Sequence, residues 1–131
     1  MTEIPVNSPE TFGNPEQVAT TKAVLNLLDD APAAQPDKAT PAVKRILQGN
    51  RANLVVFTFL PGQALQDHEA AHPIFVQSLK GHLQFTVGDE VADLTPGVIL
   101  HLDQHVRHRV DCPNGADADG NVLLVTMLTG V

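Results

Sequence analysis

The stretch LVVFTFLPGQALQDHEAAHPIFVQSLKGHLQFTVGD, residues 54–89, decides the fold. It holds three short runs rich in β-branched and aromatic residues, at 54–60, 74–79 and 83–87. A Pro-Gly pair and single glycines lie between or beyond the runs. Short apolar runs separated by turn residues are typical of strands. This stretch therefore predicts consecutive short strands.

Two further apolar runs, at 98–102 and 122–128, extend the same pattern toward the C-terminus. Ten prolines and nine glycines in 131 residues keep every element short. Many short strands at regular spacing indicate an all-β sandwich or barrel. The strand-helix alternation of a parallel α/β sheet is not seen.

The first forty residues differ from the rest, and we predict an N-terminal extension at 1–40 followed by a barrel at 41–131. Asn14 and Pro15 offer a helix N-cap and a first-turn proline, so a short helix is one alternative there. Residues 22–28 would also serve as an edge strand, and periodicity does not separate the two. Residues 31–41 contain three prolines and are read as a covering loop.

Composition limits the classes of function. With 43% hydrophobic and 18% charged residues, the chain can bury a core as a single domain. A net charge of −7 and a pI near 5.1 argue against nucleic acid or an anionic membrane as partner. Residues 1–9 lack the pattern of a secretory signal, and Cys112 is the only cysteine. We therefore expect a small cytoplasmic protein.

All six histidines lie within residues 68–108. Imidazole is the commonest side-chain ligand for divalent transition metals, because its neutral ring nitrogen donates well near pH 7. Histidines gathered on one face of a strand-rich domain therefore make a metal site, or a polar pocket, a candidate function.

The spacing around these histidines resembles the cupin superfamily, whose fold is a small jelly-roll barrel, the double-stranded β-helix. Gly62 is followed after five residues by His68, and Gly81 stands where the first cupin motif closes. In the second motif, the Gly97 of a Pro-Gly turn precedes His108 by eleven residues. The resemblance covers residues 54–128 and implies a fold that serves many chemistries.

The chain departs from the motifs at three positions. Ala70 stands in place of the second histidine, Ile74 in place of the glutamate, and Asp103 in place of a proline. Of the four usual metal ligands that the resemblance implies, His68 and His108 remain. This indicates a degenerate branch of small single-domain cupins.

His72 is the residue that would complete a metal site with His68 and His108. Four residues of straight strand span about 13 Å, too far for two imidazoles to share an ion, so the chain must bend. Pro73 makes such a bend plausible. In the alternative, His68 and His108 line a polar pocket without a metal. The residues predicted to line the pocket are His68, His72, His101, His108, Phe57 and Phe75.

Strand parity separates the remaining polar candidates. His82 alternates with apolar neighbours and is expected in solvent. His101 lies between two leucines. If the leucines face the core, His101 faces outward or packs against a neighbouring sheet or subunit. If they do not, His101 joins the pocket. His105 occupies a turn that would lie at the outer surface or reach the barrel mouth. Arg107 and Arg109 flank His108 and therefore face outward.

Other chemistries lack candidates in this chain. Cys112 has acidic neighbours that oppose a thiolate, so we expect an unreactive thiol. There is no Gly-x-Ser-x-Gly elbow, phosphate loop or dinucleotide glycine pattern, so no nucleotide cofactor is expected.

Two functions compete at this stage. In the first, the chain is a barrel that binds a small molecule, with or without a divalent metal such as Zn, Fe, Ni or Mn. In the second, which the resemblance makes typical, it is a non-haem metal-dependent oxygenase acting on a small organic substrate. A structural interaction domain would instead have its cavity filled by side chains. A homodimer is expected, because pairing hides an exposed strand edge.

Overall fold

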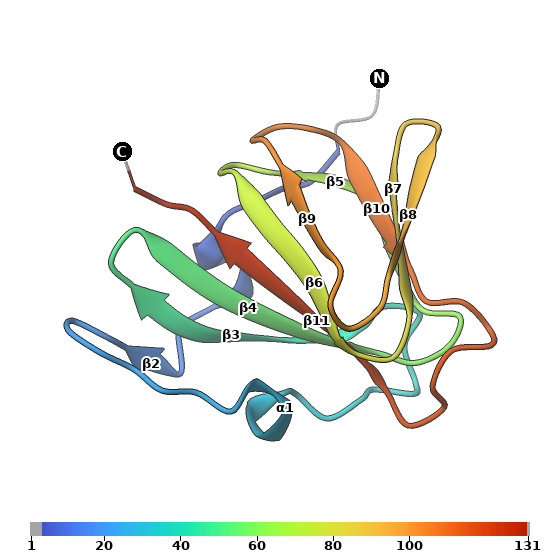
Figure 1. Cartoon of the computed structure of the whole chain (residues 1–131), viewed down its shortest axis with the longest axis horizontal. Helices are drawn as coiled ribbons and strands as arrows, with labels where there is room; N and C mark the ends of the chain where they lie inside the picture. Colours follow the sequence, from blue (N-terminus) through green and yellow to red (C-terminus); the bar gives the residue numbers. More distant parts are fainter. Residues whose placement is uncertain (1–3, 131) are drawn as a thin grey trace.

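A computed structural model describes residues 4–130 as two facing β-sheets (Figure 1). In order across the first sheet, the strands are β1 (Val6–Asn7), β5 (Ala64–Ala70), β10 (His108–Asp111), β7 (Leu83–Val87) and β8 (Glu90–Leu94). Across the second they are β2 (Gln17–Val18), β3 (Ala42–Gly49), β4 (Ala52–Phe59), β11 (Asn121–Met127), β6 (Ile74–Lys80) and β9 (Ile99–Leu102). Two single-turn helices, η1 (Pro9–Phe12) and α1 (Leu27–Asp30), complete the described chain.

The five strand runs predicted from sequence correspond to β4, β6, β7, β9 and β11. The all-β prediction is therefore confirmed.

Among the described residues no helix is long and apolar enough to cross a membrane.

The core lies between the sheets and follows the two-residue alternation of the strands. Phe57 and Phe59 of β4 and Leu123 of β11 point inward and are at most 3% exposed. Each such side chain contributes roughly 1.5–3 kcal/mol by leaving water. The core thus holds the two sheets together around the inward face of β5 and β10.

A second apolar cluster covers the outer face of the second sheet. Val56 of β4 and Leu124 of β11 point outward yet are buried, because Leu25 and Leu27 of the N-terminal region pack on that side. Strands β4 and β11 are therefore buried on both faces, which explains their almost continuous apolar sequence.

The N-terminal region follows neither of its two predicted forms. Strand β2 pairs in parallel with β3, and Glu16 N–H and Ala19 N–H donate to β3 carbonyls at 2.9 and 3.0 Å. The second bond occupies the Ala19 N–H, which a helix starting at Pro15 would need for its own bond to the Pro15 oxygen. The helix forms later at α1, where the Asn26 side chain accepts from Asp29 N–H at 3.2 Å. Residues 22–28 form no strand.

Asn121, which is fully buried at the start of β11, organises the turn between β6 and β7. Its Oδ1 accepts from His82 N–H and Asp117 N–H, and its Nδ2 donates to the carbonyls of Phe59 and Asp117. Gly81 has a φ of 79°, and a Cβ there would collide with the Asn121 side chain. Position 81 therefore requires glycine for both backbone conformation and space.

Candidate functional site

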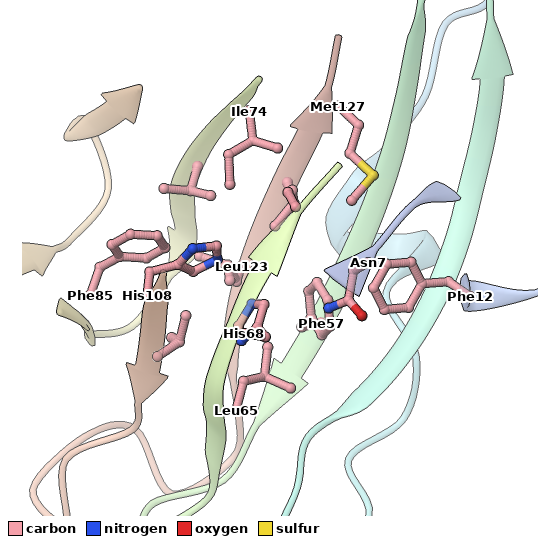
Figure 2. A pocket seen from close by; sticks show the side chains of 14 residues that line it. Asn7, Phe12, Phe57, Leu65, His68, Ile74, Phe85, His108, Leu123 and Met127 are labelled. Atoms are coloured by element: carbon pink, nitrogen blue, oxygen red, sulfur yellow. The ribbon is translucent and has the colours of Figure 1, made fainter. Parts of the chain in front are cut away.

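The antiparallel pairing of β5 with β10 places His68 directly opposite His108. Both side chains point inward and are at most 9% exposed. Their ring centroids are 4.1 Å apart, and the ring planes meet at 66° (Figure 2). The register shifts just beyond this pair, between His108 and Val110. Pairing between strands distant in sequence thus builds a compact histidine pair.

Each imidazole is oriented by a backbone carbonyl two residues earlier. His68 Nδ1 lies 2.8 Å from the Gln66 oxygen, and His108 Nδ1 lies 2.8 Å from the Val106 oxygen. A carbonyl oxygen only accepts, so each neutral ring carries its proton on Nδ1. Each Nε2 is then a free lone pair, and neither Nε2 has a hydrogen-bond partner within residues 4–130.

The surroundings keep both rings uncharged at neutral pH. The pKa of His108 is lowered to about 4, mainly by burial and also by the neighbouring His68, while the hydrogen bond to the Val106 carbonyl opposes the lowering. Burial also lowers the pKa of His68. His108 stacks on Phe85, with ring centroids 4.8 Å apart and planes within 16° of parallel. The pair therefore presents two neutral hydrogen-bond acceptors rather than a cation.

The histidine pair faces a small, mainly apolar cavity (Figure 2). The free space is about 20 Å³, which holds roughly one water molecule. Its apolar lining comes largely from the inward side chains of both sheets. These include Phe57, Phe85, Ile74, Val76, Leu123 and Val125.

Three residues predicted to line the pocket lie elsewhere. Phe75 of β6 and His101 of β9 alternate with inward neighbours and therefore face outward. Their rings pack against each other there, with centroids 4.9 Å apart. His72 lies in the bend between β5 and β6, outside the cavity lining. His68, His108 and Phe57 do line the cavity.

The predicted metal site is not assembled in this structure. Within residues 4–130, no three His, Cys, Asp or Glu side chains come together as a metal-binding group. Ala70 and Ile74, which stand where the cupin motif has ligands, contribute apolar surface to the cavity. The cavity thus offers two histidine nitrogens, one fewer than a three-ligand catalytic site requires. The residues present do not fit a resident catalytic ion.

Sequence reasoning missed two cavity residues from the N-terminal extension, Asn7 of β1 and Phe12 of η1. Phe12 packs edge-on against Phe57, with centroids 5.6 Å apart and planes at 86°. Strand β1 is two residues long and shows no alternating pattern. No local signal in the sequence indicates that these two residues reach the cavity.

The polar side chains that alternate with the pair lie on the outer face of the first sheet. Glu69 is hydrogen-bonded to His105 Nδ1 at 2.8 Å, and Arg107 donates to Asp67 at 2.8 Å. Arg109 pairs within its own strand with Asp111. His105 therefore belongs to the outer surface rather than to the barrel mouth.

Two further groups lie away from the cavity. His82 Nε2 lies 2.7 Å from an Asp93 carboxylate oxygen on the β7–β8 hairpin. Cys112 is buried, and burial raises the pKa of its thiol to about 11. The thiol is therefore protonated near pH 7, consistent with the unreactive role expected for it.

Solved structures with this architecture are numerous. A cupin superfamily protein from Desulfitobacterium hafniense is 20% identical, with a TM-score of 0.64 over 84% of this chain and 94% of that one. An RmlC-like cupin from Desulfovibrio desulfuricans is 22% identical, with a TM-score of 0.67 over 85% of this chain and 100% of that one. A Thermus thermophilus protein is 25% identical, with a TM-score of 0.64 over 79% of this chain and 96% of that one. No family model matches the chain, and no curated protein matches it.

The protein therefore has the cupin fold, a double-stranded β-helix, and the fold predicted from the resemblance is confirmed. Within that class, this chain carries an inward histidine pair in an apolar interior, with alanine and isoleucine at two positions where the cupin motif has ligands. Similarity at this level of identity establishes the fold alone, because one fold can carry many different sites and activities.

Proposed function

We propose that this protein binds a small, mainly apolar molecule that carries a hydroxyl or N–H group. The observation that carries this proposal is the pair of neutral imidazoles whose free Nε2 atoms adjoin an apolar cavity. A cavity with apolar walls and a few fixed polar groups is the usual form of a small-molecule site. The walls would bind the apolar body of the ligand, and the imidazole Nε2 atoms would accept a hydrogen bond from its hydroxyl or N–H group.

A binding experiment with a matched pair of probes tests this proposal. 4-Fluorophenol has an aromatic body and one hydroxyl donor, whereas fluorobenzene lacks the donor. By ¹⁹F NMR, we expect the phenol to bind more tightly by roughly 3- to 10-fold, the value of one neutral hydrogen bond. Equal affinity for the two probes would show that the imidazoles are not the recognition element, and no binding of either would reject the proposal.

Variants locate the binding to the pair. His68→Leu and His108→Leu each remove one acceptor while keeping an apolar side chain of moderate size, and should lower the preference for the phenol. His101→Leu is the matched control, because His101 lies on the outer face. The proposal fails if the control changes binding as much as the two inner variants.

The alternative function is a non-haem metal-dependent oxygenase, with the metal held through His68 and His108. One feature favours it: a carbonyl holds each Nδ1, an arrangement that commonly orients metal-binding histidines. The missing third ligand weighs against it. Metal analysis of untagged protein distinguishes the two functions. About one equivalent of Zn, Fe, Ni or Mn, lost in His68→Leu, would favour the oxygenase over the binding module.

We also propose that two copies of the chain associate. Strand β9 ends the described six-stranded sheet, and its Ile99 (58%) and the preceding Val98 (41%) are exposed on the sheet that also carries the outward Phe75. Identical strand edges can pair by two-fold symmetry, which supports a second copy as the partner. Sedimentation equilibrium should show a dimer that Ile99→Lys dissociates, whereas Val91→Lys on β8 leaves it intact. A monomeric parent protein would overturn this.

A further inference from the structure

The free space beside the histidine pair is too small for the ligand that the site would bind. About 20 Å³ accommodates roughly one water molecule, and an aromatic ring needs several times more. A ligand that reaches His68 and His108 therefore has to displace part of the cavity wall.

Most of the wall is held in place by hydrogen-bonded neighbours on both sides. The lining strands β4, β11 and β6 lie inside the second sheet, and β10 and β7 lie inside the first. Moving any of these strands would break two backbone ladders at once. They are therefore poor candidates for a moving wall.

The remaining wall comes from β5, which pairs with β10, and from the N-terminal segment, residues 5–13. Asn7 and Phe12 of this segment line the cavity, and Figure 2 shows both side chains on the same side of it as Phe57. Strand β1 pairs with the edge of β5 in the first sheet, while η1 contacts β3 and β4 of the second. The segment thus bridges the two sheets and closes the barrel on the β5 side, next to His68.

Backbone hydrogen bonds to β5 hold the N-terminal end of this segment. Glu69 N–H donates to the Pro5 oxygen at 3.0 Å, and Ala71 N–H donates to the Asn7 oxygen at 2.9 Å. Pro9 is fully buried, and Phe12 is packed on Phe57. A two-residue edge strand with apolar anchors is the kind of element that opens locally without unfolding the domain.

The C-terminal end of the segment is fixed by a different contact. Arg45 is only 7% exposed, and its guanidinium donates to the Gly13 oxygen at 3.0 Å and to Asn53 Oδ1 at 2.8 Å. Gly13 has a φ of 85° and no atom near its missing Cβ. Gly13 therefore joins an oxygen anchored to the second sheet to a backbone conformation that glycine adopts and leaves without steric cost, as a hinge requires.

We propose that residues 5–13 form a displaceable plug that hinges at Gly13 and closes the histidine cavity until a ligand takes the place of Asn7 and Phe12. This inference rests on the proposed binding function, and it adds the regulation of access to that site. Ligand and plug compete for the same volume, so the fraction of open chains sets the apparent affinity.

A reversible cross-link tests the plug directly. Val6 and Glu69 are partners across the β1–β5 pairing, so a V6C/E69C variant places two thiols within disulfide reach. Cys112 is buried and protonated, so it does not compete for these thiols. We expect oxidation to weaken 4-fluorophenol binding at least tenfold and dithiothreitol to restore it. The single variant E69C should respond to neither treatment.

The outcomes separate this inference from the proposed function. If the phenol binds equally well to the oxidised and reduced forms, the plug is wrong and the binding function stands. If neither the parent nor the reduced protein binds the phenol, the binding function fails. The plug is then decided by hydrogen exchange of the uncross-linked chain. The amides of Glu69 and Ala71 should exchange at least tenfold faster than those of β11, and faster still in Phe12→Ala. Exchange as slow as in β11 would reject the plug.

Discussion

Histidines occupy two contrasting environments in this barrel. His68 and His108 face inward, contact aromatic and apolar groups, and hold their Nδ1 protons on backbone carbonyls. His82 and His105 lie on the outside and pair with the carboxylates of Asp93 and Glu69. Burial in the inner environment lowers the pKa values of its two histidines. In the outer environment, solvent screens the attraction between each histidine and its carboxylate.

The contrast shows that position relative to the sheet decides what a histidine can do. An outer imidazole with a carboxylate partner in solvent contributes little energy and has no enclosed space beside it. An inner imidazole is buried, neutral and fixed in one tautomer, which are the requirements for selective recognition of a donor group. Substitutions at the inner and at the outer histidines should therefore have effects of different size.

The largest effect is expected from placing a permanent charge in the inner environment. His108→Lys would bury an ammonium without a carboxylate partner in the cavity and should lower the free energy of unfolding by roughly 3–5 kcal/mol at pH 7. Guanidinium denaturation measures this. His101→Lys on the outer face should stay within about 0.5 kcal/mol of the parent. Similar losses in both variants would contradict the assigned environments.

Acid should destabilise the protein through the inner pair. Because the folded-state pKa of His108 is about 4 against an ordinary value of 6.5, only the unfolded chain binds its proton between these values. Stability is therefore complete above pH 6.5 and falls as the pH is lowered, by on the order of 3 kcal/mol at pH 4. Urea denaturation across this range measures the slope, and His108→Gln should reduce it. An unchanged slope in the variant would mean that groups other than His108 cause the loss of stability in acid.

Removing an outer pair should have a small effect. His105 has a φ of 59°, so asparagine is the replacement that tolerates its backbone. His105→Asn removes the contact with Glu69 and should cost less than about 1 kcal/mol in thermal or chemical unfolding. A loss comparable to that of His108→Lys would mean that the outer pair supports the barrel.

The smallest effect concerns a single carboxyl group. The hydrogen bond from His82 is the main reason why the pKa of Asp93 lies below its ordinary value of 3.8. In His82→Ala, the pKa of Asp93 should rise toward that value in a ¹³C NMR titration. An unchanged pKa would assign the lowering to Gln84, whose amide also donates to Asp93.

The strand-rich half of the chain was predictable because its signals are local. Alternating apolar runs at 54–60 and 122–128 correspond to β4 and β11, and motif spacing marked His68 and His108. Strands β3, β5, β8 and β10 carry outward charged residues or register shifts that weaken the pattern, so composition alone did not single them out.

The cavity was only partly predictable. The predicted Phe57 and the two inward histidines line it, whereas no local sequence pattern marks Asn7 or Phe12 as lining residues. Those two residues reach it because a two-residue strand pairs with β5, a contact with no local pattern. Similarly, the cap at Asn14 indicated a helix, but pairing of Gln17–Val18 with β3 uses the backbone groups that a helix needs.

By itself, the sequence determined the all-β class, the positions of the apolar strands and the opposite orientation of neighbouring side chains, because strand alternation is a property of consecutive residues. Only the tertiary structure decided that His68 lies opposite His108, that His72 and His101 stay outside, and that the N-terminal segment closes the cavity. These depend on the register between strands far apart in the chain, which is set by the packing of the whole core.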